Sequence, residues 1–181
     1  MDSAIAVNPN QAGLAGALDA LAKGASLVLV RSDSWSDDKL IDLAKAARQH
    51  TSAALLVGHG RLQEDLSLAG LLKRPRVFGP VALRVDRWPR MAPDRALLRR
   101  DPVLDHAASW VLAVLCAAHG GVVATADTYH PRRAHHDPHD PDELRPEGRA
   151  WLTQLALRLV PESAQTDALA GALYKSWSGA R

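Results

Sequence analysis

The most conspicuous residues that could do chemistry form a tract rich in histidine, proline and aspartate. Between residues 127 and 143 the sequence reads DTYHPRRAHHDPHDPDE. The tract holds four of the eight histidines, which are His130, His135, His136 and His139. Imidazole and carboxylate groups bind Zn, Ni or Fe, so His135, His136 and His139 are candidate metal ligands. The prolines stiffen the chain and oppose a closed site, so a solvated loop over residues 127–146 is the other interpretation.

Positive charge is concentrated in one segment of a chain whose formal net charge is only +2. Residues 73–100 contain nine Lys or Arg residues and only two Asp or Glu residues. Such a segment indicates an anionic partner, such as phosphate, nucleic acid or an acidic protein surface. The guanidinium groups that could form a phosphate pocket belong to Arg84, Arg87, Arg90 and Arg95. With RNA, Trp88 could stack on a base. The third interpretation is a solvated basic edge.

Two smaller features have both a chemical and a structural interpretation. Gly58-His59-Gly60 follows an apolar run, where α/β folds often place groups that contact ligands. No GxGxxG or GxxxxGK[ST] motif accompanies it, so a tight turn is the favoured interpretation. Cys116 is the only cysteine, which excludes an intramolecular disulfide and a cysteine metal cluster. Its apolar surroundings predict a buried, inert thiol.

These residues must be positioned by strands and helices, which the hydrophobic pattern predicts in alternation. Short apolar runs predict strands at Ser26–Val30, Ala53–Val57, Val77–Val85 and Gly121–Ala126. Pro80 indicates that the third strand lies at a sheet edge or begins late. Apolar spacings of three and four predict helices at Gln11–Ala22, from Ser34 or Ser36 to Gln49, at Leu62–Leu72 and at Asp101–His119. The last helix is apolar on nearly every face, which predicts burial.

Length and composition bound the fold class. With 181 residues, we expect a single layered α/β domain over residues 1–181, with a flexible N-terminus over residues 1–10. An apolar fraction of 47% and a charged fraction of 23% exclude a fully disordered or collagen-like chain. The longest apolar stretch, Ala107–Ala118, is well short of the about 20 residues that cross a bilayer. No secretory signal is visible, so we expect a cytoplasmic protein without membrane contact.

Taken in order, these segments resemble 3,4-dihydroxy-2-butanone 4-phosphate synthase, a riboflavin-biosynthesis family with its own α/β fold. The family's opening helix and strand are similar to ALDALAKGASLVLV, and its next helix and strand to IDLAKAARQHTSAALLVG. A strand with a V-D step and an A-x-D-R-A stretch resemble VALRVDR and APDRALLRR. The family's R-R-x-G-H-T-E-A-A helix and following strand resemble LRRDPVLDHAASWVLAVLCAAHGGVVATAD. The similarity runs from about residue 11 to residue 175.

The resemblance implies the family's fold, a homodimer with active sites at the subunit interface, and a lyase reaction. In that reaction Mg²⁺ assists the conversion of ribulose 5-phosphate, a phosphorylated sugar, to a four-carbon product and formate. Carboxylates hold the hard cation, which polarises the carbonyl and hydroxyl groups of the sugar, while an acid/base pair moves protons.

Departures from the family pattern fall on the residues that carry this chemistry. The acidic loop D-D-E-x-R-E-N-E-G-D corresponds here to RSDSWSDDK, so the metal-holding glutamate falls near Ser36 and the arginine near Trp35. The G-H-T-E histidine falls near Val103 or Leu104, and the glutamate of the fourth strand falls at Thr125. The glycine-rich phosphate loop is also shortened, and about thirty family residues are missing before Asp101.

The resemblance still leaves candidate site residues. Asp33, Asp38 and His106 would be catalytic, and Asp38 and His106 would also be the metal ligands. Substrate-binding roles would belong to Arg31, Asp94 and Arg95, of which the last two match the A-x-D-R-A stretch.

Serine, threonine and an aliphatic residue cannot replace two metal carboxylates and an imidazole. We therefore expect a synthase-like protein without the lyase activity, acting as a homodimeric scaffold or regulatory partner. One alternative is a Mg²⁺-dependent lyase, or a related enzyme on a phosphorylated small molecule, with relocated acid/base residues. The other is a module that binds anions or nucleic acid through residues 73–100. Mg²⁺ is expected as a cofactor only if the family activity is retained.

Overall fold

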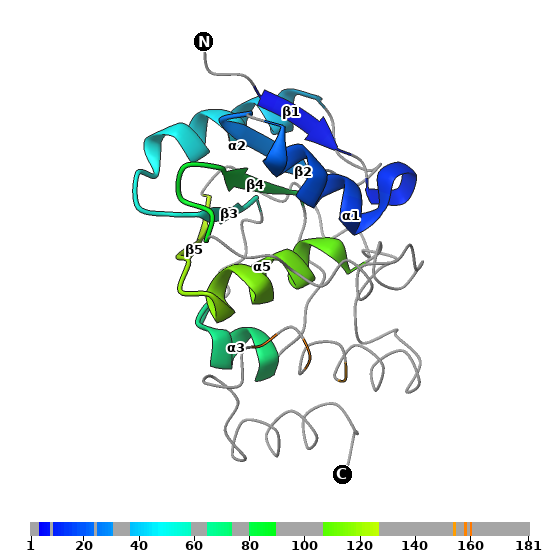
Figure 1. Ribbon diagram of the computed structural model, residues 1–181. Coiled ribbons are helices and arrows are strands. Elements are labelled where there is room, and N and C mark those ends of the chain that lie inside the picture. Colours follow the sequence, from blue (N-terminus) through cyan, green and yellow to red (C-terminus); the bar gives the residue numbers. More distant parts are fainter. Residues whose placement is uncertain are drawn as a thin grey trace, which may run out of the picture.

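The computed structural model describes residues 4–7, 9–23, 25–30, 37–58, 65–73, 80–89 and 107–126, together with Gln154, Arg158 and Val160. Strands and helices alternate along this part of the chain (Figure 1). In chain order they are β1 (Ala4–Val7), α1 (Pro9–Ala22), β2 (Leu27–Val30), α2 (Asp37–Gln49), β3 (Leu55–Val57), α3 (Leu68–Lys73), β4 (Val81–Arg84), α5 (Ala108–Ala118) and β5 (Val123–Thr125).

The strands form one five-stranded mixed sheet in the order β1-β2-β4-β3-β5. β1 pairs in parallel with β2, and β3 pairs in parallel with β5. Between these two parallel pairs lies β4, which is antiparallel to both of its neighbours. The expectation of an α/β protein is therefore confirmed, with a mixed sheet as its centre.

Side-chain alternation along the strands separates two cores, one on each face of the sheet. One face packs against α1, α3 and α5, and its buried strand residues are Val7, Val28, Val30, Leu55, Val57, Val81 and Leu83. The other face packs against α2, and its strand residues are Leu27, Leu29, Leu56 and Ala82. Figure 1 shows the resulting layers, with α2 above the sheet, α5 below it and α3 beyond α5.

The two central helices differ because their surroundings differ. α2 buries Leu40, Leu43, Ala44 and Ala47 and leaves its other side in solvent, as an amphipathic helix on a sheet does. α5 is buried at every residue from Ala108 to Cys116 because the sheet covers one side and α3 covers another. The indole Nε1 of Trp110 donates a hydrogen bond of 2.9 Å to the Leu71 carbonyl, which fixes α5 against α3. The predicted burial of the all-apolar helix is confirmed for these residues.

α5 ends in a Schellman motif that turns the chain into β5. The amide of Gly120 donates to the Ala117 carbonyl at 3.1 Å, and the amide of Gly121 donates to the Cys116 carbonyl at 2.8 Å. Gly120 has a φ of 81°, a conformation that a residue with a Cβ rarely adopts. The glycine pair therefore explains why the helix stops here.

Two strands differ from the sequence expectation. β1 occupies residues 4–7, inside the N-terminal stretch that we expected to be flexible, and it pairs with β2 along its whole length. Its pairing with β2 reveals this strand, which the sequence analysis did not predict. β4 begins directly after Pro80 and is the central strand, so of the two expectations for Pro80 the late start is confirmed and the edge position is wrong.

The predicted helix at Leu62–Leu72 begins later than expected. In the described part of this range α3 starts at Leu68, because the chain turns just before it. The Asp65 carboxylate accepts a hydrogen bond of 2.9 Å from the Ser67 amide, and the Ser67 hydroxyl accepts one of 3.2 Å from the Gly70 amide. Ser67 thus caps the helix and sets its first residue.

None of the helices in the described residues is both long and apolar enough to cross a membrane.

Candidate functional site

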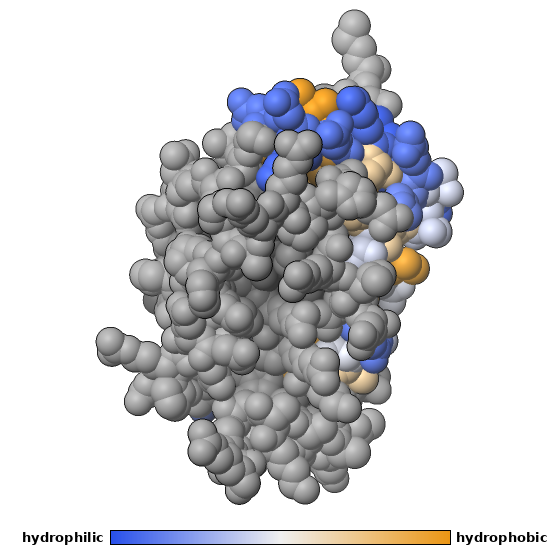
Figure 2. Space-filling model, turned by 180° about the vertical axis from the view of Figure 1, so that it is seen from behind, coloured by the Kyte–Doolittle hydropathy of each residue, from blue (hydrophilic) through white to orange (hydrophobic). Residues whose placement is uncertain are grey.

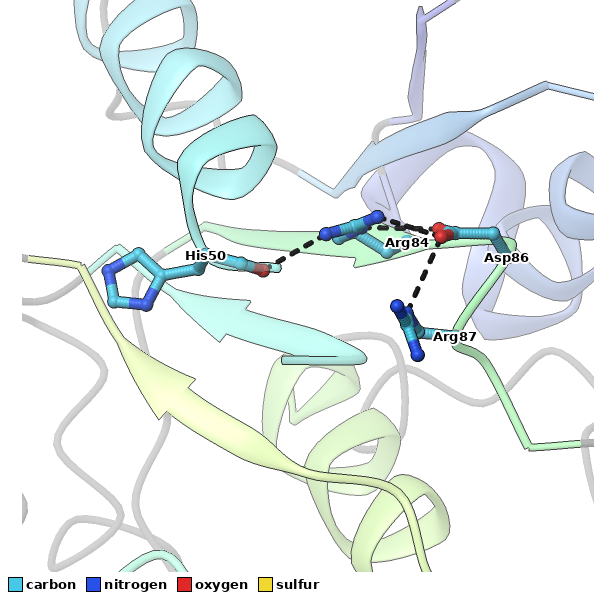
Figure 3. A network of polar contacts seen from close by, with 4 residues as sticks. All are labelled: His50, Arg84, Asp86 and Arg87. Carbon is cyan, nitrogen blue, oxygen red and sulfur yellow. Dashed lines mark hydrogen bonds and ion pairs between the residues drawn. The ribbon is translucent and has the colours of Figure 1, made fainter. Parts of the chain in front are cut away.

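A network of polar contacts lies where β4 ends, and it is the most organised charged group among the described residues (Figure 3). The Arg84 guanidinium donates from Nε to Asp86 Oδ1 at 3.1 Å and from Nη2 to Asp86 Oδ2 at 2.7 Å. Its remaining nitrogen, Nη1, donates to the His50 carbonyl at 3.0 Å. Arg87 approaches the same carboxylate, with 3.6 Å between its Nε and Asp86 Oδ2. One carboxylate therefore serves two guanidinium groups.

The sheet itself places Arg84 in this position. Arg84 is the last residue of β4 and lies opposite Leu27 of β2 in the antiparallel register. Its backbone amide donates to the Ala54 carbonyl at 2.9 Å, while its carbonyl accepts the amide of Trp88 at 2.8 Å in the following turn. Asp86 lies in the turn that follows β4, and this turn brings its carboxylate to the Arg84 guanidinium.

Exposure decides what this network can do chemically. The Arg84 side chain is 19% exposed, whereas those of Asp86 and Arg87 are 56% and 55% exposed. All three Arg84 nitrogen atoms have protein partners, so this guanidinium joins the end of β4 to the chain after α2. In Figure 3 the His50 imidazole points away from Arg84, so the histidine takes part through its backbone only.

This geometry bears on the predicted phosphate pocket. Of its four arginines, Arg84 and Arg87 are described, and Arg90 and Arg95 lie outside the described residues. Arg84 is engaged by Asp86 and by the His50 carbonyl, while Arg87 keeps a largely exposed side chain. Trp88, which could stack on a base under the RNA interpretation, is partly buried against the main core.

Asp38 is the one candidate catalytic residue within the described ranges. It lies in the first turn of α2 next to Asp37, and its side chain is exposed. A carboxylate in this position interacts favourably with the positive end of the helix dipole. On the same side of α2, Asp42 forms an ion pair of 3.3 Å with Lys45. Asp38 therefore belongs to the solvated outer side of α2, opposite the side that packs on the sheet.

The other predicted site residues lie outside the described residues. They are Arg31, Asp33, Asp94, Arg95, His106, His135, His136 and His139, together with the loop over residues 127–146. Within the ranges that the structure describes, no three His, Cys, Asp or Glu side chains group in a way that could hold a metal ion. The Mg²⁺ site and the histidine metal site both stay predictions.

The structural interpretation of Cys116 is confirmed. Its side chain is fully buried in α5, and burial raises the pKa of the thiol from 9.0 to about 12. The thiolate is the nucleophilic form of cysteine, so a thiol held protonated in this way is inert at neutral pH.

Gly58 has a packing role that explains why this position is a glycine. Its amide donates to the Pro80 carbonyl at 2.9 Å, so the chain after β3 lies directly against the start of β4. A Cβ at this position would be 3.0 Å from the Pro80 oxygen and 3.2 Å from Leu43 Cδ2. The predicted turn stays a prediction, because His59 and Gly60 lie outside the described residues.

The sequence analysis did not predict the hydrogen bond from Arg84 to the His50 carbonyl. The nearness of Arg84 and Asp86 in the sequence is a signal for the ion pair, because opposite charges two residues apart can meet in a turn. No local signal connects Arg84 with a carbonyl 34 residues away.

Comparison with known proteins adds no relative: no protein-family model, no curated protein and no solved structure matches this chain.

Proposed function

We propose that this chain is a cytoplasmic relative of 3,4-dihydroxy-2-butanone 4-phosphate synthase with the same single-domain α/β fold but without the lyase activity. It acts as a homodimeric scaffold or regulatory partner. The proposal depends on the resemblance described above, and one observation in the described residues carries its non-catalytic part. That observation is the placement of α2 and α5 on opposite faces of the sheet.

The lyase alternative needs Asp38 and His106 to work together. Asp38 is on the outer side of α2, which packs on the face formed by Leu27, Leu29, Leu56 and Ala82. Ala107, the residue after His106 in the sequence, is buried in the core on the other face. Packed layers are usually about 10 Å apart, so helices on opposite faces have axes roughly 20 Å apart. Within one chain this placement disfavours an acid/base pair or a shared cation site, whose groups lie within about 3 Å of a common atom.

The arginine at the end of β4 supports the same proposal. A phosphate-binding guanidinium must leave donors free for the substrate, and bidentate recognition uses two of them. Arg84 gives two of its five N–H donors to Asp86 and one to the His50 carbonyl, and the Asp86 carboxylate offsets its charge, so this guanidinium suits a role in stabilising the fold.

Formate release is the decisive measurement for the catalytic question. The protein is incubated at high concentration with ribulose 5-phosphate and Mg²⁺, beside an active synthase as the positive control. We expect no more formate than in the protein-free reaction, and the same result for Asp38→Asn. Mg²⁺-dependent formate release that Asp38→Asn reduces would overturn the proposal in favour of the lyase alternative.

A second measurement addresses the binding module on residues 73–100. Binding of a short RNA is titrated at several salt concentrations, because contacts between basic residues and phosphates weaken steeply as salt rises. We expect no salt-sensitive binding, and Arg87→Ala serves as the matched variant since Arg87 is the exposed arginine of the network. Strong binding that salt and Arg87→Ala both weaken would replace the scaffold with the anion-binding module.

A further inference from the structure

The outer side of α2 combines an exposed apolar residue with charges of opposite sign at its two ends. Ile41 is 52% exposed near the middle of the helix. Asp37 and Asp38 lie in the first turn, and Arg48 lies in the last turn. The rear view in Figure 2 shows this helix surface as a hydrophilic band with a small hydrophobic area within it. A single exposed isoleucine is common on a protein surface, and what distinguishes this side of α2 is its place between charges of opposite sign.

The spacing of these residues defines a single stripe along the helix. Asp38, Ile41, Lys45 and Arg48 are separated by three, four and three residues, which places them on one side of a helix with 3.6 residues per turn. We name this set the α2 stripe. All four side chains are exposed.

The α2 stripe is complementary to itself in one orientation only. When two copies pack with their helices antiparallel about a two-fold axis, Asp38 of each copy faces Arg48 of the other. Ile41 then packs on the alkyl stem of the partner's Lys45, which can cover apolar surface while its ammonium group stays in water. The helix dipoles are also antiparallel in this arrangement. In the parallel orientation, Asp38 would face Asp38 and Arg48 would face Arg48, and both contacts are repulsive.

We infer that the α2 stripe is a self-association surface, through which a second copy of this chain packs antiparallel on α2. This inference rests on the homodimeric part of the proposed function and gives it a location. A helix of 13 residues is only about 20 Å long, so this contact alone is smaller than the roughly 1,000 Å² of a stable interface. Association through the stripe is therefore concentration-dependent, and salt weakens it because the pairing charges are exposed.

Charge reversal tests the pairing directly. Sedimentation velocity over a range of concentrations, at low and high salt, measures the dimer dissociation constant of the full chain. Asp38→Arg and Arg48→Asp each place like charges opposite each other at two symmetric positions, and each weakens the dimer about tenfold or more. The double variant, which carries both changes, restores the pair with its signs exchanged and recovers most of the wild-type affinity. Lys23→Asp is the control, since it has the same charge change as Arg48→Asp at an exposed position after α1.

The outcomes separate this inference from the proposed function. A wild-type dimer that both single variants leave unchanged overturns the α2 stripe while the homodimer stands. Equal weakening by Lys23→Asp also overturns it, because the effect would then be one of net charge. A wild-type chain that stays monomeric at the highest concentration overturns the stripe and the homodimer together. The formate assay tests a different claim, which is that the protein lacks the lyase activity. Circular dichroism of each variant checks that α2 is folded.

Discussion

Removing Arg84 should cost stability in a way that the geometry of its three hydrogen bonds specifies. Replacement by methionine keeps most of the aliphatic stem and removes the guanidinium. The lost interactions are the two-bond pair with Asp86, at 3.1 and 2.7 Å, and the bond of 3.0 Å to the His50 carbonyl. A matched variant is Arg87→Met, because Arg87 approaches the same carboxylate at 3.6 Å from a side chain that is 55% exposed.

The expected loss of stability depends on how strongly solvent screens the ion pair of Arg84 and Asp86. Opposite charges about 4 Å apart attract by about 1 kcal/mol in water and about 4 kcal/mol at an effective dielectric constant near 20. Arg84 is mostly buried at 19% exposure, but Asp86 is 56% exposed, so solvent screens the pair toward the lower value. We expect a coupling free energy of about 1 kcal/mol between Arg84 and Asp86. Adding the bond to the His50 carbonyl, Arg84→Met should lower the free energy of unfolding by about 2 kcal/mol.

A double-mutant cycle measures this coupling. Urea unfolding is followed by tryptophan fluorescence for the wild type, Arg84→Met, Asp86→Ala and the double variant. The same cycle with Arg87→Met should give a coupling of no more than about 0.5 kcal/mol, as for an exposed ion pair. Equal coupling for the two arginines would refute the assignment of Arg84 as the fold-stabilising partner. So would an Arg84–Asp86 coupling that is indistinguishable from zero.

Three further predictions concern the core. Trp110→Phe removes the buried hydrogen bond of 2.9 Å to the Leu71 carbonyl, so the free energy of unfolding should fall by about 1–3 kcal/mol in a denaturant titration, and an unchanged midpoint would contradict the role of this bond. Gly121→Ala would bring a Cβ to 2.5 Å from Cys116 Sγ, whereas Gly120→Ala meets nothing within 4 Å and suffers only from its φ of 81°. Thermal unfolding should therefore show the larger loss for Gly121→Ala, and the reverse order would count against the packing argument. The Cys116 thiol has a pKa raised from 9.0 to about 12 in the folded state, so the folded protein keeps a proton that the unfolded chain releases. The contribution of this thiol to the free energy of unfolding is fully present below pH 9 and is lost as the pH rises from 9 to 12. Cys116→Ala should remove this part of the loss of stability at alkaline pH. Iodoacetamide should modify the thiol slowly until the protein unfolds, and equally fast reaction in the folded state would show that it is accessible.

Much of the fold could be predicted from local patterns, and much of the site could not. The strands at β2, β3 and β5, the amphipathic α2 and the buried α5 all follow from the spacing of apolar residues, which depends only on the immediate sequence. The inert state of Cys116 follows in the same way, because its neighbours are apolar. Of the predicted catalytic residues, Asp38 alone lies in the described ranges, and it faces solvent on α2, as a charged residue outside the apolar side of an amphipathic helix does.

The sequence by itself determined most of the described strands and helices and the apolar side of α2, but not β1 or the start of α3. Only the tertiary structure decided how the strands pair. β4 enters antiparallel between β2 and β3, and this insertion brings Arg84 to a carbonyl 34 residues away in the chain. It likewise decided that α2 and α5 lie on opposite faces of the sheet, which separates Asp38 from the helix that follows His106. The physical reason is that hydrophobic periodicity indicates which side of a helix or strand is buried. Strand order depends instead on contacts between segments that are distant in the sequence, and no local pattern encodes them.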